Sequence, residues 1–357
     1  MNNPISSPSY LIVCLRFLGD VLVTTPLALS IKTADPDAVV DYLVFDGTDK
    51  VLAKNPHIRK VITVPKGSAG LGAVLTLFNN YDVAIAAYPS DRSVVAAVIA
   101  GKQAVGLVNG WKKEWWKCAL LDHHEVSYDR IHVISNVLMP LRMLGIDPVP
   151  RVVMGYDAAD SAFAQEKIPY QRYVILHPYS MKEYKYWSAE KWAQLVPLIE
   201  KQTGCTAIFT RTPEPEGEAY LEQIRKFAPQ GIKVLDSVCT LNQLAAIIKG
   251  SVAFIGIDTA ITHLAAAMDI PTVAIFGPTL TRYWAPWPNG CSESSPFSAG
   301  KGIQQVGKVT VVQKEWPCVP CNNETCAITT RGVMECLEQL DEHEVFGALK
   351  VALDKAR

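Results

Sequence analysis

The first residue suited to chemistry is a carboxylate placed directly after a buried apolar run. Asp20 follows the run Tyr10–Arg16 and a glycine that permits a tight turn, at the start of a predicted helix whose dipole favours the ionised form. Such a carboxylate could take a proton from an attacking hydroxyl, provided that it lies at the accessible edge of its domain. The alternative is an aspartate that caps the helix and satisfies backbone N–H groups.

The strongest local signal is GIDTAITH, residues 256–263, which leads from an apolar run into an alanine-rich helix. Backbone N–H groups at Thr259 and Ala260 would face a ligand, because the start of a helix has free N–H groups that bind phosphate readily. Asp258 and His263 are the candidate side chains here. Their ordinary alternatives are a helix cap and a packed histidine.

Two further loops follow apolar runs. The loop after residues 173–177 carries Ser180 and Lys185, which could complete a pyrophosphate site through charge-assisted hydrogen bonds. Glu214 follows the next apolar run, where an acidic residue can accept hydrogen bonds from ribose hydroxyls. Each has an ordinary alternative, a solvated lysine or a residue of a proline-rich turn.

These residues can form a site only if the strands that precede them end beside one another. Strand-like runs alternate with stretches long enough for crossover helices, at residues 10–16, 39–45, 60–64, 83–87, 173–177, 207–210, 234–235, 253–257 and 272–276. The fold class is therefore predicted to be α/β, with two Rossmann-like domains, 1–165 and 166–357, and a cleft between them. Ligands of such sheets bind beyond the carboxyl ends of the strands. The last helix is a candidate to pack back on the N-terminal domain.

Composition narrows the class of protein. The 357 residues are 49% hydrophobic and 19% charged, which suits folded domains, and 34 Lys+Arg against 35 Asp+Glu leave a net charge of −1. No protein-wide field would attract nucleic acid, so none is expected as a partner. We predict a cytoplasmic protein, since no apolar run is long enough to cross a bilayer and the first ten residues do not form a secretory signal.

Two segments carry a family resemblance that extends over nearly the whole chain. RFLGDVLVTTPL, residues 16–27, and GIDTAITHLAAAMDIPTVAIFGPTLTRYWAPW, residues 256–287, resemble the two signatures of the ADP-heptose:lipopolysaccharide heptosyltransferases, which form glycosyltransferase family 9. The sequence Asp258-Thr259-Ala260 is most similar to the heptosyltransferase III branch, where other branches tend to have glycine third.

The resemblance implies a GT-B glycosyltransferase that moves heptose from ADP-heptose to the lipopolysaccharide inner core with inversion. The N-terminal domain would bind the acceptor and the C-terminal domain the nucleotide sugar, with no cofactor or metal required. Its partners would be a lipid-linked saccharide and the cytoplasmic face of the inner membrane, where the protein would be peripheral.

The same resemblance implies roles for individual residues. Asp20 matches the base that deprotonates the acceptor. The matching donor-site residues are Ser180 and Lys185 for phosphate, Glu214 or Glu216 for ribose, and Asp258, Thr259 and His263 around heptose and diphosphate, with the Ala260 methyl near the sugar. Because of that methyl group, the sequence does not decide whether the donor sugar is heptose. The alternatives are transfer from another nucleotide sugar, a nucleotide-sugar epimerase, and a non-catalytic nucleotide- or glycolipid-binding protein.

Aromatic and cationic residues alternate in WKKEWWK, residues 111–117. Lys112, Lys113, Trp115 and Trp116 suit the anionic interface around a lipid-linked acceptor. The alternative is a surface helix that buries its tryptophans in the core.

Nine cysteines, an odd number, do not form a secreted disulfide framework. Cys318, Cys321, Cys326 and Cys336 have the spacing C-x2-C-x4-C-x9-C, which could form a four-thiolate zinc site. The second half is not a clean C-x2-C pair, so we expect reduced structural thiols and keep zinc as the alternative.

Overall fold

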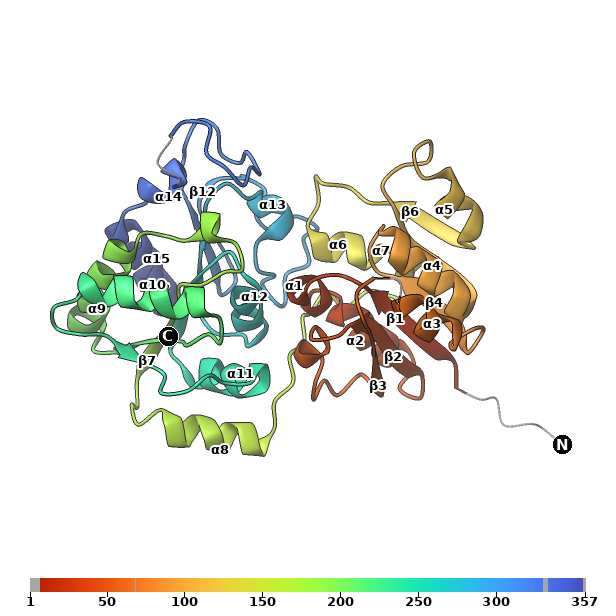
Figure 1. The fold of residues 1–357 in the computed structure, drawn as a ribbon, viewed down its shortest axis with the longest axis horizontal. Coiled ribbons are helices and arrows are strands. Elements are labelled where there is room, and N and C mark those ends of the chain that lie inside the picture. Colours follow the sequence, from red (N-terminus) through yellow and green to blue (C-terminus); the bar gives the residue numbers. More distant parts are fainter. Residues whose placement is uncertain (1–6, 68, 330–332, 356–357) are drawn as a thin grey trace. The chain divides into compact units, whose positions relative to one another are not determined.

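The computed structural model describes residues 7–67, 69–329 and 333–355. The chain divides into two compact units, Met1–Gly155 and Tyr156–Arg357 (Figure 1). The predicted boundary, between residues 165 and 166, lies inside a helix, α8 (Ala158–Lys167), that packs on α11 (Leu241–Gly250) of the second unit. Because of this packing the structure divides the chain before α8, after Gly155.

The first unit is built on one parallel sheet. Its strands are β1 (Ser9–Cys14), β2 (Val39–Phe45), β3 (Lys60–Val64), β4 (Tyr81–Ala86), β5 (Gly101–Val108) and β6 (His123–Val126), in the order β3-β2-β1-β4-β5-β6. The helices are α1 (Leu18–Leu22), α2 (Thr25–Ala34), α3 (Ala69–Leu75), α4 (Asp91–Ala100), α5 (Trp115–Leu120), α6 (Val133–Val137) and α7 (Met139–Met143), with a 3-10 turn at Asp49–Val51. The strand order changes direction beside β1, which places the β1 loop where open α/β sheets bind ligands.

The second unit repeats this architecture with a longer sheet. Its strands are β7 (Tyr173–His177), β8 (Thr206–Phe209), β9 (Lys233–Val234), β10 (Ala253–Ile257), β11 (Thr272–Phe276), β12 (Gly302–Val306) and β13 (Val309–Gln313), in the order β12-β13-β11-β10-β7-β8-β9. Only β12 among the described strands runs antiparallel to its neighbour. The helices besides α8 and α11 are α9 (Ala189–Thr203), α10 (Pro215–Lys226), α12 (Ala260–Ala267), α13 (Thr281–Trp284), α14 (Glu335–Glu338) and α15 (Glu342–Asp354), with a 3-10 turn at Glu183–Lys185.

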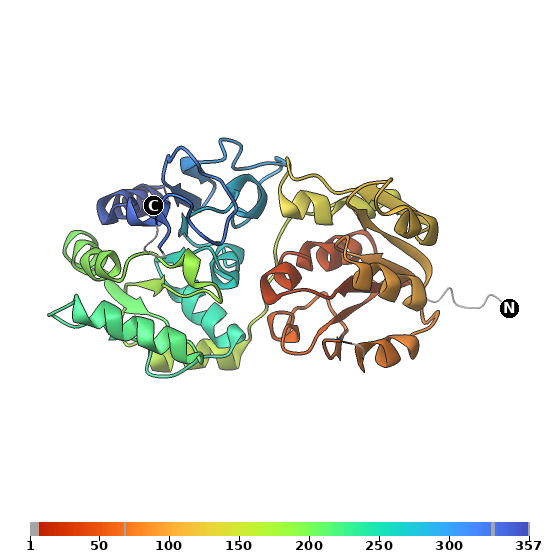
Figure 2. The same ribbon diagram turned by 45° about the horizontal axis from the view of Figure 1, so that its top comes forward.

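Alternating side chains bury both faces of the second sheet. Ile255 and Ile275 point into a core shared with α9, α10 and α15, while the neighbouring Ala274 and Phe276 pack on the other face with Ala266 of α12. Buried on both faces, these strands are continuous apolar runs, and this is why the sequence pattern located them. Figure 2 shows helices above and below the sheet in each unit.

The predicted α/β class with two Rossmann-like sheets is confirmed, with differences in detail that include the unpredicted strand β6. β5 was not predicted because it follows α4 without an intervening turn, Gly101 being both the helix cap and the first strand residue. The hairpin β12–β13 was also not predicted. The last helix, α15, packs on α9, β10, β11 and β13 of its own unit, and the expectation that it also packs on the N-terminal domain stays a prediction. No helix of the described residues combines the length and apolarity that crossing a bilayer requires.

Candidate active site

Asp20 lies in the first turn of α1, immediately beyond the carboxyl end of β1. The cap position of this helix is Phe17, so the interpretation of Asp20 as an N-cap is wrong. Arg16 Nε lies 3.0 Å from Asp20 Oδ1, and the Arg16 guanidinium stacks 4.8 Å from the ring centre of Tyr88. Arg16 of the loop after β1 and Tyr88 of the loop after β4 therefore lie together beside the Asp20 carboxylate.

The carboxylate of Asp20 is more enclosed than predicted. Asp20 is 7% exposed, so the expectation of an accessible carboxylate at the domain edge is not met in this structure. Burial raises the pKa of Asp20 above its usual range, while the Arg16 guanidinium, the Phe17 backbone N–H and the Tyr88 hydroxyl lower it. Because the net effect is a raised pKa, the Asp20 carboxylate is a stronger base than a carboxylate in water.

In the second unit, three loops at the carboxyl edge of the sheet join around Asp258. Lys185, from the loop after β7, places Nζ 2.7 Å from Asp258 Oδ2, and Asp258 directly follows β10. Thr279, from the loop after β11, donates a hydrogen bond of 2.7 Å to the same oxygen. Lys185 and Asp258 were predicted separately, and the structure brings them together. Thr279 was not predicted, because a threonine after GP has no distinctive pattern.

His263 lies one turn into α12, close to this ion pair. Burial lowers the pKa of His263 to about 4, with the negative Asp258 acting in the opposite direction and Lys185 adding to the fall. The imidazole is therefore neutral at pH 7, and its Nδ1 atom is buried without a hydrogen-bond partner among the described residues. It can offer or accept one hydrogen bond, but it brings no positive charge to a phosphate.

Thr259 is the N-cap residue of α12 and Ala260 is its first residue, and both are half-buried. Asp258 stands one position before the cap, so the interpretation of Asp258 as a helix cap is also wrong. Thr262 donates to the Ile257 carbonyl oxygen and fixes the turn between β10 and α12. The start of the helix, with its unsatisfied N–H groups, is thus held beside Asp258.

The remaining predicted donor residues gather near Tyr186. Burial raises the pKa of the Tyr186 hydroxyl, the Ser180 backbone N–H lowers it, and the carboxylates of Glu216 and Glu214 are close enough to raise it further. Ser180 is half-buried, and Glu214 is exposed at the cap position of α10, where Thr212 donates a hydrogen bond to its carboxylate. Their joint role in binding one ligand stays a prediction.

A buried histidine supports the same edge of the sheet. His177 Nδ1 lies 2.8 Å from Thr210 Oγ1, which joins the ends of β7 and β8. Burial lowers the pKa of His177 to about 3, so the ring is neutral. It was not predicted, because the last residue of an apolar run looks like part of the core. Its contacts are structural.

The aromatic and cationic segment of the first unit is largely exposed. Trp111 is 66% and Trp115 is 69% exposed, Lys112 and Lys113 are exposed, and Trp116 is half-buried. The alternative in which the tryptophans fill the core is therefore wrong. The last cation of the segment differs: Lys117 is buried against Asp91 and Glu114 and serves the fold.

Comparisons with known proteins identify relatives by sequence and by fold. The sequence model described as glycosyltransferase family 9 (heptosyltransferase) matches residues 76–301. Lipopolysaccharide heptosyltransferase 3 of Escherichia coli is 26% identical over 294 residues, which cover 77% of this chain and 85% of that protein.

Solved structures share the fold. The family 9 glycosyltransferase of Veillonella parvula superposes with a TM-score of 0.74 at 18% identity, covering 98% of this chain and 97% of that one. The E. coli heptosyltransferase WaaC, solved with ADP-2-deoxy-2-fluoro heptose, gives a TM-score of 0.67 at 19% identity, covering 98% of this chain and 100% of that one.

Proposed function

Since the chain belongs to glycosyltransferase family 9, the heptosyltransferase family, we propose that it transfers heptose from ADP-heptose to the inner core of lipopolysaccharide. The family makes it a glycosyltransferase. The relative named lipopolysaccharide heptosyltransferase 3 supports the acceptor class, and WaaC, solved with an ADP-heptose analogue, supports the donor.

The observation that carries the proposal is the cluster of Lys185, Asp258 and His263 at the start of α12. Lys185 offers a cation for the diphosphate, and the α12 N-terminus offers backbone N–H groups. The unpartnered Nδ1 of His263 offers one hydrogen bond to the sugar or the phosphate. Ser180 would add a phosphate contact, and Glu214 or Glu216 would bind the ribose.

Asp20 is the proposed base. Its carboxylate accepts the proton of the acceptor hydroxyl while that oxygen attacks the anomeric carbon, and the bond to the ADP oxygen breaks on the opposite face. One displacement of this kind inverts the anomeric configuration. The negative charge that develops on the diphosphate is stabilised by Lys185 and the helix terminus.

The acceptor is lipid-linked, so we propose that the protein works at a membrane surface as a peripheral protein of the cytoplasmic side. The exposed Trp111 and Trp115 can enter the headgroup region, and Lys112 and Lys113 can pair with anionic headgroups. These residues also remain candidates for contact with the saccharide acceptor.

The test is product analysis with a panel of nucleotide sugars and a truncated core acceptor. We expect ADP release that depends on acceptor, and a product heavier by one heptose. ADP release without acceptor would favour hydrolysis, and a changed donor without transfer would favour an epimerase. Asp20→Asn serves as the control: it should bind ADP as the natural protein does and form product about 10² to 10⁴ times more slowly.

A further inference from the structure

A buried amide side chain lies at the carboxyl end of β13. Gln313 is the last residue of this strand, pairs with Phe276 at the end of β11, and is 1% exposed. Long polar side chains are seldom buried so completely unless they are paired, because each polar atom loses its hydrogen bonds to water. A glutamine at this edge of the sheet therefore needs partners in the loops that follow the strands.

The Gln313 side chain donates both of its amide hydrogens to one loop. Its Nε2 atom lies 2.7 Å from the Gly277 carbonyl oxygen and 2.9 Å from the Thr279 carbonyl oxygen, both in the loop after β11. An amide nitrogen carries two hydrogens, so its capacity to donate is used completely. Pro278 stands between the two carbonyl groups, and Gln313 thus holds the backbone on both sides of it.

The oxygen of the same amide group has no partner. Gln313 Oε1 is buried without a hydrogen bond among the described residues, which is unfavourable for an acceptor. The opposite orientation of the amide would set its oxygen against two carbonyl oxygens, so the two donated bonds decide which end is which. Packing alone would favour an apolar residue at this depth, and we infer that the two donated bonds are what requires glutamine here.

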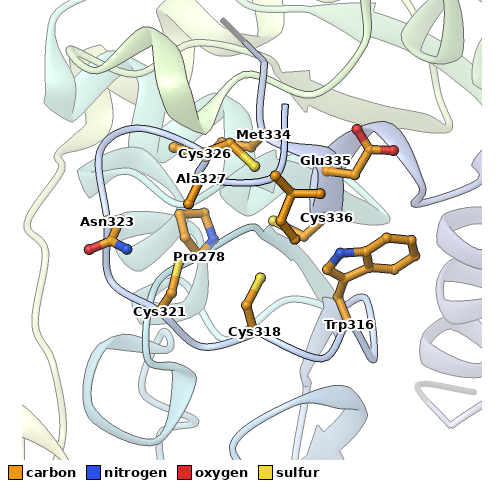
Figure 3. A pocket seen from close by; sticks show the side chains of 11 residues that line it. Pro278, Trp316, Cys318, Cys321, Asn323, Cys326, Ala327, Met334, Glu335 and Cys336 are labelled. Atoms are coloured by element: carbon orange, nitrogen blue, oxygen red, sulfur yellow. The ribbon is translucent and has the colours of Figure 1, made fainter. Parts of the chain in front are cut away.

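Other contacts hold different atoms of this loop. Asn322 donates its backbone N–H to the Pro278 carbonyl oxygen at 2.9 Å, and its side-chain oxygen accepts from the Leu280 N–H at 2.8 Å. Figure 3 shows Pro278 in a pocket of about 60 Å³ that is also lined by Cys318, Cys321, Cys326 and Cys336, all free thiols. The carbonyl groups of Gly277 and Thr279 are the part of the loop that Gln313 holds.

The loop held in this way carries the Thr279 hydroxyl that binds Asp258. Thr279 Oγ1 donates to Asp258 Oδ2 at 2.7 Å, and Lys185 Nζ lies 2.7 Å from the same oxygen. Asp258 is 6% exposed, so its carboxylate has little access to water and relies on donors from the protein. One buried oxygen is therefore shared between a hydroxyl and an ammonium group.

This sharing affects how easily Lys185 can turn to a diphosphate. A bound diphosphate competes with Asp258 for the ammonium hydrogens of Lys185. Withdrawal of Lys185 from a buried carboxylate that has lost its other donor would be strongly unfavourable, because the charge would be left unpaired. The Thr279 hydroxyl lowers this cost, since it stays on Asp258 while Lys185 contacts the ligand.

We propose that Gln313 is a positioning residue of the donor site: it holds the Thr279 hydroxyl on Asp258 and so frees Lys185 to bind the diphosphate. Gln313 acts through Thr279 and does not touch the ligand. The inference rests on the proposed function in taking the ligand to be an ADP-sugar.

The experiment measures the affinity of the full chain for ADP by isothermal titration. Thr279→Val removes the hydroxyl and keeps the shape of the side chain, so ADP should bind about tenfold more weakly. Thr279→Ser keeps the hydroxyl and should bind ADP within about threefold of the natural protein. Gln313→Met, which has a side chain of similar length and no donor, should lose about as much affinity as Thr279→Val.

The double variant shows whether Gln313 acts through Thr279. If it does, the addition of Gln313→Met to Thr279→Val should weaken ADP binding by no more than about twofold further. Independent effects would multiply to a loss of about a hundredfold, and that result would overturn the proposal. The matched control is Gln305→Met in β12, whose buried Oε1 also has no partner among the described residues; it should leave ADP affinity unchanged.

Melting temperatures separate a loss of folding from a loss of placement. Should Gln313→Met fail to fold, Gln313→Glu replaces it in the same cycle, because its carboxylate has the shape of the amide and no hydrogen to donate. A natural chain that binds no ADP would overturn the proposed function and this inference together. ADP binding that is equal in Thr279→Val and Thr279→Ser would overturn the inference alone.

Discussion

At the scale of single residues, the balance of charge around Asp20 decides when it can act as a base. Burial raises the pKa of this carboxyl, and Arg16, 3.0 Å away, acts in the opposite direction. A base must be ionised to accept a proton, so kcat should rise with pH through the pKa of Asp20 and then level off.

Arg16→Gln removes the positive charge that favours the ionised form. The pKa of Asp20 should then rise further, and the acidic limb of the kcat–pH profile should move to higher pH, while kcat on the plateau changes much less. Arg92→Gln is the matched control, because Arg92 also lies over an aromatic ring, that of Phe45, and has no contact with Asp20 among those described. A profile that stays in place in Arg16→Gln would contradict the role of Asp20 as the base.

Lys185 provides the second prediction at this scale. Lys185→Met removes a charge-assisted bond of about 1.5 to 3 kcal/mol, so ADP should bind about 10 to 100 times more weakly. Isothermal titration with ADP measures this directly. Lys182→Met, which removes an exposed lysine of the same loop that pairs with Glu324, should leave ADP affinity within about threefold. Equal losses in both variants would show that the loop contributes only general positive charge.

At the scale of elements, the turn from β10 into α12 depends on the absence of a side chain at Gly256. A Cβ atom there would lie 2.6 Å from Phe254 Cε1 and 2.7 Å from Thr262 Oγ1, the hydroxyl that fixes the turn before Asp258. The strand and the helix start can approach this closely only with glycine.

Gly256→Ala should therefore lower the free energy of unfolding of the second unit by about 1 to 3 kcal/mol through overpacking and weaken ADP binding as the helix start moves. Gly347→Ala in α15 is the matched control: its Cβ meets no atom within 4 Å, and alanine in a helix is favoured by up to about 1 kcal/mol. Calorimetric unfolding of both variants measures the difference. Equal stability of the two would mean that the β10–α12 contact adapts without cost.

At the scale of the whole molecule, a net charge of −1 gives no general attraction to an anionic surface. Any attraction to anionic vesicles must come from the local segment that contains Trp111, Lys112, Lys113 and Trp115. Because each lysine near an anionic surface contributes about 1 kcal/mol, the segment is sufficient for reversible binding and insufficient for a permanent anchor.

Flotation with phosphatidylserine-containing vesicles tests this segment. Lys112→Gln/Lys113→Gln should weaken binding by about tenfold or more, and the effect should disappear at high salt or with neutral vesicles. Trp111→Ser/Trp115→Ser should weaken binding to both kinds of vesicle. Met181→Ser is the control, since Met181 is 86% exposed and lies in the second unit. Unchanged flotation of the tryptophan variant would leave the segment as an acceptor-binding candidate only.

Local sequence was enough to locate most strands and three of the candidate side chains. Asp20, Lys185 and Asp258 each come after a continuous apolar run, and a buried parallel strand imposes that pattern on its own sequence. The candidate side chains that follow the strands could therefore be located from the sequence alone. The strands β6 and β12 were missed because half-buried strands give no such run, and β13 was missed although all of its residues are buried.

Only the tertiary structure decided which of these residues touch. Thr279 joins Lys185 at Asp258 because β7, β10 and β11 are neighbours in the sheet, an order that no local pattern encodes. In the same way, Tyr88 reaches Asp20 because β4 pairs with β1. Apolar periodicity is a local property that a strand needs for its own burial, whereas contacts between strand ends depend on sheet order, which is set by packing across the whole domain.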